Sequence, residues 1–527
     1  MNVLIIGAGH NGLTTAFYLA KAGHSVTMLE RREVVGGCAV TEEFAPGFSA
    51  PLANAIGPLR PSVIRDMGLL RRVEFLQPDP RLVALGSDGH ALAFGDIPRT
   101  MEAIRAFSSK DADRYPEFCA TLQRLGGFLA GLLEQTPPSL DAPAAGEMWE
   151  LLKVGKRFRA LGRTDGFRLL RWGPMAVADL VAEWFEIDLL QAAVAARGIF
   201  GTAQGPWSAG SGAVLLLNAA VDPAPGGSSV MVKGGPGALS AAMADATRAA
   251  GVTIRTGAGV ARILVRDGKA VGVVLEDGSE VPGDAVISNA DPRRTFLGLI
   301  EPVELDPSFL SKVRNFRARG TVAKVHLALD AIPAFRGVAN PADLHGRIQI
   351  GPGIDYLERS FDASKYGELP TNPYLDVTVP TIGDPSLAPP GKHVLSAHVQ
   401  FVPHQLARPE SWDTARDRLL GIVLATLEKF APGISASVEA SDVLTPQDLE
   451  QRYGISGGQI YHGEPALDQL FTMRPVLGWA RYRTPIDGLF LCGSGTHPGG
   501  GITAASGQNA AREIGSHLSR RTSHVRT

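Results

Sequence analysis

The sequence has 527 residues, enough for about two to four domains, and its 45% hydrophobic and 20% charged content is typical of a globular protein. The formal net charge of −2 excludes the strongly basic character of most nucleic-acid-binding proteins. Three cysteines, Cys38, Cys119 and Cys492, are too far apart for a CxxC pair, which argues against disulfide-reductase chemistry and fits a reducing compartment such as the cytoplasm.

The N-terminal stretch predicts a nucleotide-binding turn. Four apolar residues at 3–6 read as a buried strand, and residues 13–22 read as a helix with apolar residues on one face. Between them lie Gly7, Gly9 and Gly12 at the GxGxxG spacing. Gly7 permits a tight turn, Gly9 lets the backbone approach a pyrophosphate, and Gly12 lets the helix pack closely on the strand.

The context of this turn strengthens the prediction. His10 and Asn11 lie where the free N–H groups of a helix N-terminus favour an anion. Residues 25–29 form a second strand, and Glu30 follows at the position where an acidic residue binds a ribose hydroxyl. The alternative is an ordinary strand–helix–strand unit without a ligand. Because the first strand starts within three residues of the N-terminus, no cleavable signal peptide is expected.

An extension after the second strand bears on the choice of cofactor. Arg31 is followed by a glycine doublet, Gly36 and Gly37, and then by Cys38 and Ala39. This extension resembles the flavoprotein superfamily of glutathione reductase, amine oxidases and carotenoid desaturases, and the resemblance favours FAD over NAD. From the residues alone, the doublet indicates only a second close approach of the backbone.

Residues 100–200 differ in composition and predict a helical insertion or cap, because Leu, Ala, Arg and Glu favour helices. Apolar residues within 151–172 are interspersed with Lys153, Lys156, Arg157, Arg159, Arg163, Arg168 and Arg171. One interpretation is a basic amphipathic surface that lies on anionic lipid, at the inner face of a membrane. The other is a solvated helical face over an ordinary core. No charge-free run is long enough to span a bilayer.

The middle of the chain reads as a return to the nucleotide-binding domain. Residues 252–255 form a strand, 260–265 and 270–275 form a hairpin across an Asp-Gly turn, and 284–290 form a buried strand. In the FAD domain that this region resembles, the strand at Val260 contacts the adenine. No further GxGxxG stands between a strand and a helix, so no separate NAD(P)H domain is predicted.

Residues 301–479 alternate strands, such as 321–329 and 392–401, with helices, which predicts a substrate domain with a floor of sheet.

The C-terminal segment is the second strong signal. An apolar strand meets a glycine-rich turn that includes Gly493, Ser494, Gly501, Ile502 and Thr503, and a helix of small residues follows. In the flavoprotein superfamily this turn lies at the flavin end, where the helix dipole would stabilise negative charge on the reduced ring. Many members carry an acidic residue where this chain has Ser494. The alternative is a plain strand–helix turn.

Motifs along most of the chain carry a closer resemblance, namely residues 7–13, 36–43, 234–239, 288–292 and 460–471. Together with the C-terminal segment, they resemble the phytoene dehydrogenase-related FAD-dependent oxidoreductases. The nearest resemblance is to the pyridine nucleotide-disulfide oxidoreductase domain-containing protein 2 group, with carotenoid desaturases and retinol saturase more distant. The resemblance is weakest over residues 100–200.

The resemblance implies an α/β fold with a discontinuous Rossmann-type FAD-binding domain of the glutathione reductase/amine oxidase superfamily. We expect this domain to comprise residues 1–75, 225–300 and 480–527. A helical cap or insertion with substrate-domain segments would occupy residues 76–224, and a mixed-sheet substrate domain residues 301–479.

The predicted chemistry is hydride transfer between a carbon of an apolar, isoprenoid or lipid-like substrate and flavin N5. Candidate proton carriers are His462 and Glu464, on a loop before the C-terminal segment, and His497 beside the predicted flavin loop. Each has a structural alternative: either histidine could bond only to backbone, and Glu464 could pair with Arg474 or Arg481.

Other functions stay open at this stage. A redox-neutral isomerase or hydratase, an amine oxidase and a flavin-binding interaction protein are alternatives, and an amine oxidase would need an aromatic cage, for which Trp207, Tyr461 and Trp479 are candidates. The electron acceptor would be oxygen, a quinone or an organic partner. No metal site and no nucleic-acid partner are predicted, and the sequence leaves the oligomeric state open.

Overall fold

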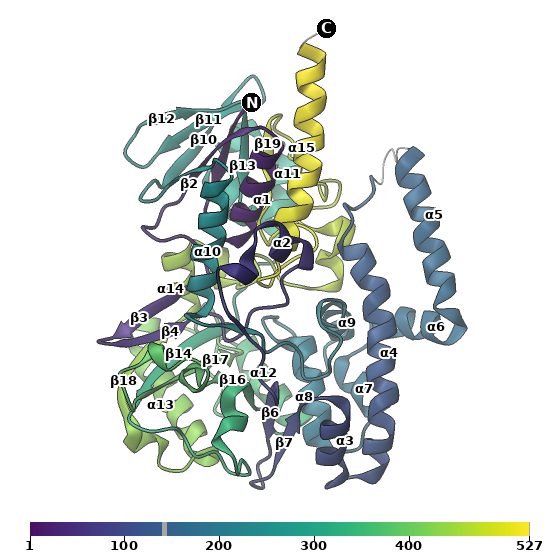
Figure 1. Ribbon diagram of the computed structural model, residues 1–527, viewed down its shortest axis with the longest axis vertical. Coiled ribbons are helices and arrows are strands. Elements are labelled where there is room, and N and C mark those ends of the chain that lie inside the picture. Colours follow the sequence, from purple (N-terminus) through teal and green to yellow (C-terminus); the bar gives the residue numbers. More distant parts are fainter. Residues whose placement is uncertain (140–144, 526–527) are drawn as a thin grey trace.

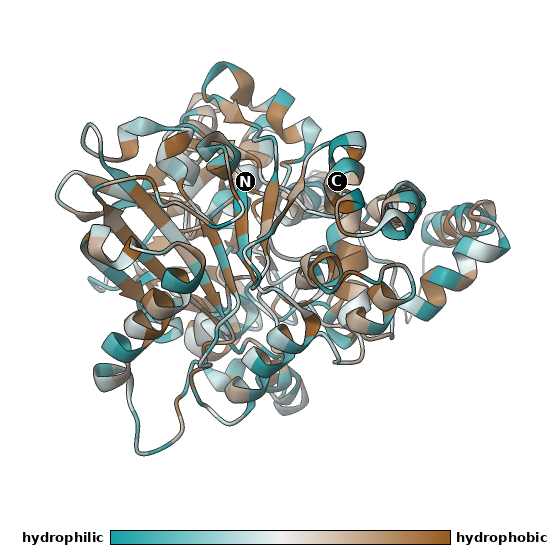
Figure 2. Cartoon of the chain, turned by 90° about the horizontal axis from the view of Figure 1, so that it is seen from below, coloured by the Kyte–Doolittle hydropathy of each residue, from teal (hydrophilic) through white to brown (hydrophobic). Residues whose placement is uncertain are grey.

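The computed structural model describes residues 1–139 and 145–525. Figure 1 shows a parallel sheet in the upper part of the molecule, a mixed sheet at lower left and a layer of helices on the right. In Figure 2 many of the strands are brown, the colour of hydrophobic residues, as expected for a buried core.

The parallel sheet joins three distant sections of the chain. Its strand order is β19 (Leu489–Leu491), β13 (Ala285–Ser288), β1 (Asn2–Ile6), β2 (Ser25–Leu29) and β9 (Thr253–Arg255). Apart from the edge strand β9, the strands are short and mostly apolar, as strands covered on both faces must be. All five fall where the sequence predicts strands.

Different layers cover the two faces of this sheet. On one face, α1 (His10–Lys21), α10 (Gly235–Ala249) and α15 (Ala505–Val525) pack over alternate residues of β1. The predicted hairpin, β10 (Val260–Arg266) and β11 (Lys269–Leu275), packs over the other residues of β1. Strand β12 (Glu280–Pro282) pairs with β11, and α11 (Pro307–Asn315) lies in the same apolar cluster.

The mixed sheet has seven strands. Their order is β18 (Val438–Leu444), β14 (Val322–Leu329), β17 (His393–Gln400), β16 (Leu375–Thr378), β15 (Arg347–Ile350), β6 (Leu82–Leu85) and β7 (Ala91–Phe94). Helix α13 (Trp412–Phe430) packs on one face, against the apolar residues that alternate along β14 and β17. The strands predicted at 321–329 and 392–401 are therefore confirmed. Strands β6 and β7, which extend this sheet, come from the stretch predicted to combine a helical cap with substrate-domain segments.

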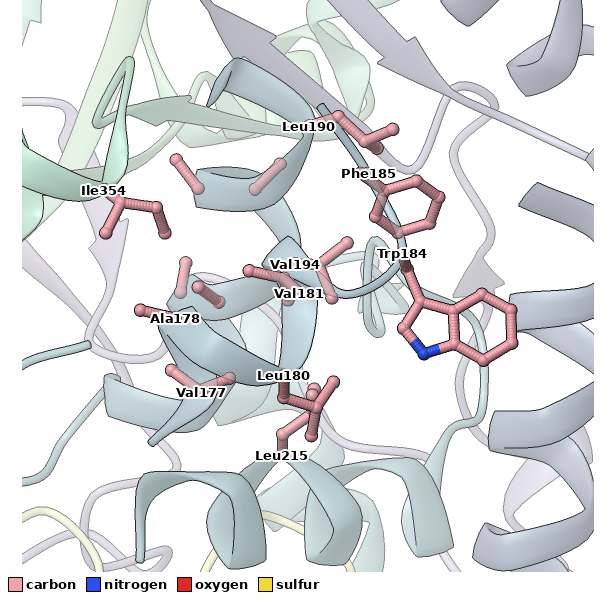
Figure 3. Close-up of a cluster of buried hydrophobic side chains, with 14 of the residues drawn as sticks. Val177, Ala178, Leu180, Val181, Trp184, Phe185, Leu190, Val194, Leu215 and Ile354 are labelled. Atoms are coloured by element: carbon pink, nitrogen blue, oxygen red, sulfur yellow. The ribbon is translucent and has the colours of Figure 1, made fainter. Parts of the chain in front are cut away.

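The helical layer consists of α3 (Ile97–Arg105), α4 (Ser109–Leu133), α5 (Ala145–Ala160), α6 (Gly162–Trp172), α7 (Val177–Ala182), α8 (Asp188–Ile199) and α9 (Ser211–Val221). Figure 3 shows the core of this layer, where side chains such as Val181, Val194 and Leu215 point toward one another. Helix α5 stands apart from the body in Figure 1. No helix among the described residues combines the length and apolarity needed to cross a bilayer.

Shorter elements complete the fold. These are β3 (Thr41–Ala45), β4 (Phe48–Pro51), α2 (Pro61–Asp66), β5 (Phe75–Leu76), β8 (Met231–Val232), α12 (Ile354–Lys365) and α14 (Pro446–Tyr453).

Candidate functional site

A cavity of about 390 Å³ lies between the two sheets, which is within the usual size range of ligand pockets. Its lining begins at the carboxyl ends of β1 and β2 and ends at the polar face of the mixed sheet. The predicted cofactor residues that line it are Gly7, Gly9, His10, Asn11, Glu30, Arg31, Gly36, Gly37, Cys38, Ala39, Val260, Ser494, Gly501, Ile502 and Thr503. Gly12 and Gly493 lie behind this lining.

The first glycine-rich turn is too tight for side chains. Gly7 has φ +88°, a backbone conformation that favours glycine. A Cβ on Gly12 would lie 2.5 Å from the carbonyl oxygen of Gly7, and a Cβ on Gly9 would lie 2.8 Å from Nδ2 of Asn289. The turn therefore leaves bare backbone along the cavity wall, which is what close approach of a pyrophosphate requires.

Glu30 ties the end of β2 to this turn. One carboxylate oxygen accepts a hydrogen bond from the backbone N–H of Ala8 at 2.7 Å, and the other accepts from that of Arg32 at 2.9 Å. A carboxylate has about four acceptor positions, so two stay available toward the cavity. Glu30 is therefore held in place and can still accept a hydrogen bond from a ribose hydroxyl.

The two glycine-rich segments meet through Asn11. Its Nδ2 donates to Oγ of Ser494 at 3.0 Å, and its Oδ1 accepts from the backbone N–H of Gly507 at 3.1 Å. A Cβ on Gly507 would lie 2.3 Å from the carbonyl oxygen of Asn11, so α1 and α15 touch backbone to backbone. The N-terminal ends of both helices thus border one cavity, and both favour negative charge there.

Of the three predicted proton carriers, only His462 lines the cavity. It has φ +59°, and its Nδ1 has no hydrogen-bond partner among the described residues. Burial lowers its pKa, although the Asp291 carboxylate opposes the shift. Burial and the nearby His462 also lower the pKa of His10, to about 4. Two neutral imidazoles therefore lie on the wall of the cavity.

Glu464 and His497 lie behind the wall. The carboxylate of Glu464 accepts from Nε of Arg317 at 2.9 Å and from the backbone N–H of Ala203 at 2.9 Å. The alternative pairing of Glu464 with Arg474 or Arg481 is wrong, because Arg317 occupies that position.

His497 is fully buried and packs against the ring of Phe471, with a centroid separation of 5.5 Å. Burial lowers its pKa to about 3, so this ring is also neutral. Its position supports the C-terminal turn from behind.

A polar cluster forms the floor of the cavity. Lys324 on β14 and Asp376 on β16 both lie directly opposite His398 on β17, so the three side chains share one face of the sheet. Nζ of Lys324 donates to Oδ1 of Asn54 and lies 3.5 Å from Nε2 of His398. Asp376 accepts from Nε of Arg347 at 2.8 Å. All five residues line the cavity.

Burial sets the protonation of this floor. It lowers the pKa of Lys324 well below 10.5, with Asp376 only partly opposing the shift. Burial together with Lys324 lowers the pKa of His398 to about 4. Although burial alone would raise the pKa of Asp376, Arg347 and His398 hold it below its usual value. The floor thus combines an amine shifted toward its neutral, proton-accepting form with a permanent carboxylate.

Sequence reasoning missed this floor, although a signal was present. Lys324 and His326 alternate with Val325 and Leu327 along β14, and the apolar pair faces α13. Such alternation in a strand marks two faces with different surroundings. Only the register of three strands shows that the polar residues converge.

The candidate aromatic cage does not assemble. Tyr461 lines the cavity, whereas Trp207 and Trp479 do not, and Trp207 is 48% exposed. The ring of Tyr461 is fixed between Gly201 and Gly500, because a Cβ on either glycine would lie within 2.4 Å of a ring carbon. No group of three or more His, Cys, Asp or Glu residues in the described parts of the chain is arranged to hold a metal ion.

Comparisons with known proteins agree with this geometry. The family model for flavin containing amine oxidoreductases matches residues 12–515. The chain is 36% identical to pyridine nucleotide-disulfide oxidoreductase domain-containing protein 2 of Rattus norvegicus, over 97% of this chain and 93% of that protein. It is 26% identical to a neurosporene-forming phytoene desaturase of Rhodobacter capsulatus, over 96% and 91% of the two chains. An oxidoreductase structure from Methanosarcina mazei has the same fold, with a TM-score of 0.60 at 19% identity over 98% and 99% of the two chains.

Proposed function

The chain belongs to the flavin containing amine oxidoreductase family, and from this premise we propose that it uses FAD to oxidise a carbon–carbon bond of an apolar, isoprenoid or lipid-like substrate. The family resemblance and the α/β fold expected from the sequence are thereby confirmed. The observation that carries the proposal is a single cavity that connects both glycine-rich turns with a proton-accepting floor.

The residues present fit FAD. The turn at Gly7 to Gly12 leaves bare backbone beside a helix N-terminus, and Glu30 keeps acceptor positions for a ribose hydroxyl. Ser494, bonded to Asn11, borders the same cavity from the C-terminal turn. Flavin, when bound, supplies a hydride acceptor at N5.

The protein must then accept a proton. Oxidation of a C–C single bond to a double bond removes a hydride from one carbon and a proton from its neighbour. We propose that the neutral amine of Lys324 accepts this proton, since it lines the cavity and has a lowered pKa.

Amine oxidation is less well supported. The candidate cage residues do not converge, and the floor carries Arg347, whose positive charge would repel a protonated amine.

The test is anaerobic mixing of the purified, flavin-loaded protein with isoprenoid and fatty substrates in a stopped-flow spectrometer. Bleaching of the oxidised flavin band by substrate supports the proposal. Turnover that needs prior reduction, without net use of reductant, would instead identify an isomerase or hydratase. A protein that is colourless from a riboflavin-rich host and takes up no FAD would contradict the proposal.

His462 provides a second test of the cavity wall. We expect His462→Ala to slow flavin reduction by about tenfold or more and to leave bound flavin unchanged, because the lost imidazole lines the cavity. His462→Asn is the matched control, since asparagine tolerates the positive φ but cannot carry the proton. Unchanged reduction rates in both variants would remove His462 from the proton path.

We propose that helices α5 and α6 contact the surface of an anionic bilayer. At 100° per residue, Met148, Trp149, Leu152, Lys156 and Arg159 share one face of α5, and all five are exposed. Trp149 is 61% exposed and Leu152 64%. Exposed apolar and basic side chains on one helix face suit an interface with anionic lipid.

Vesicle sedimentation tests this contact. We expect the protein to bind vesicles that contain phosphatidylglycerol and not vesicles of phosphatidylcholine alone. The double variant Trp149→Ser, Leu152→Ser should weaken binding by about tenfold or more, because two side chains lose their burial in the lipid. Leu70→Ser is the control, since Leu70 is 72% exposed and lies outside α5 and α6. Equal binding by all three proteins would contradict the contact.

A further inference from the structure

Two arginines, one buried and one partly buried, line the cavity where α8 meets the mixed sheet. Arg197 on α8 is 8% exposed, and its guanidinium donates to the backbone carbonyls of Ala224 at 2.6 Å and Asp222 at 2.7 Å. Arg347 on β15 lines the same cavity. A guanidinium has five N–H donors, so these two hydrogen bonds leave donors of Arg197 available.

The charges around these arginines do not balance. Nε of Arg347 lies 2.8 Å from Asp376, and Nη1 of Arg81 lies 3.6 Å from Asp222. Among the described residues, Arg197 has no carboxylate within ion-pair distance. Burial lowers the pKa of Arg197 to about 10, with Asp222 opposing the shift, so this side chain stays protonated near pH 7. Three guanidiniums therefore share two carboxylates.

The backbone at Gly227 brings the two cavity arginines together. Gly227 lines the cavity with φ +73°, and a Cβ there would lie 3.1 Å from Nε of Arg197 and 3.3 Å from Nη1 of Arg347. Nη1 of Arg347 donates to the backbone carbonyls of Gly226 at 3.2 Å and Ser228 at 3.3 Å, so both guanidiniums lie beside the same backbone turn of the cavity wall. A buried positive charge without a partner is costly, and a carboxylate is the group that a guanidinium binds best, through paired hydrogen bonds.

We infer that the substrate carries a carboxylate, which binds between Arg197 and Arg347 while its apolar chain lies along the cavity. This inference rests on the proposed function, because it takes the cavity to be the substrate site. It narrows the substrate to an isoprenoid or fatty acid, as opposed to a hydrocarbon or an amine. The competing explanation is that Arg197 only holds the turn at Asp222 and Ala224.

Calorimetric titration with decanoate and 1-decanol separates these explanations, because the two probes share an apolar chain and differ at one end. At about pH 8 the carboxylate is ionised. We expect the holoprotein to bind decanoate at least tenfold more tightly than decanol. Arg197→Gln should weaken decanoate binding at least tenfold and leave decanol binding unchanged. Equal affinities for the two probes, or an equal loss for both in the variant, would overturn the inference.

A second pair of variants leaves both arginines in place. Val221 lines the cavity, is 41% exposed and immediately precedes Asp222. Val221→Glu should lower the ratio of decanoate affinity to decanol affinity, and Val221→Lys should raise it. Equal decanoate affinity in Val221→Glu and Val221→Lys would overturn the inference. A wild-type protein without flavin that still prefers decanoate would overturn the proposed function and leave this inference standing.

Discussion

Replacement of Gly12 by alanine is expected to abolish flavin binding, although Gly12 itself lies behind the cavity wall. The new Cβ would lie 2.5 Å from the carbonyl oxygen of Gly7 and 3.1 Å from Cγ of Asn289. Both neighbours line the cavity, so the turn must move into the space that the pyrophosphate would occupy. We expect Gly12→Ala to be purified with less than about a tenth of the wild-type flavin, as measured by absorbance.

Two further glycines serve as controls. Gly126→Ala places a Cβ 2.3 Å from the carbonyl oxygen of Ala219, and neither residue lines the cavity, so it should lower the melting temperature and keep the flavin. Gly127→Ala meets no atom within 4 Å and should change neither property. Full flavin content in Gly12→Ala, or flavin loss in Gly126→Ala equal to that in Gly12→Ala, would refute the specific role of the first turn.

Replacement of Lys324 by methionine is expected to slow flavin reduction by about 10²–10⁴-fold, the usual contribution of a positioned proton carrier. Methionine has a similar length and no proton-accepting atom, so the cavity keeps its shape. Flavin content should stay at the wild-type level, because the residues that fit the cofactor belong to the two glycine-rich turns. Lys312→Met, on the exposed side of α11, is the matched control and should behave as wild type.

The pH profile gives an independent readout for Lys324. Only the neutral amine accepts a proton, and burial lowers its pKa well below 10.5. kcat/KM should therefore rise with pH through this lowered pKa and level off above it. Lys324→Met should lack this rise, whereas a variant that only distorts the floor would keep it at a lower rate. A wild-type profile in Lys324→Met would rule out the proposed role.

The nucleotide-binding part of the fold was predictable because its signals are local. The strand at 3–6, the three glycines and Glu30 follow one another within one strand–helix–strand unit, and the backbone geometry needs glycine at each position. The hairpin on either side of the Asp-Gly turn was predictable for the same reason.

The floor of the site was not predictable in this way. Lys324, Arg347, Asp376 and His398 come from four strands, and their meeting depends on the register of those strands. We chose Glu464 and His497 as candidates because they are close in sequence to the C-terminal turn. Neither side chain lines the cavity. Position along the chain indicates a neighbourhood, whereas access to the cavity depends on which way each side chain points.

The order of strands in the parallel sheet has a consequence for biosynthesis. Strand β1 leaves the ribosome first, yet its neighbour β13 is made near the middle of translation, and β19, which pairs with β13, near the end. Until β13 is made, β1 keeps an unpaired edge, and β13 then keeps one until β19 is made; such edges invite aggregation. The hydrogen bonds of Asn11 with Ser494 and Gly507 likewise cannot form until these two residues have been synthesised. FAD is therefore expected to bind only after synthesis is complete and to protect full-length chains from proteolysis. Chains that terminate prematurely should be degraded however much riboflavin the cell holds.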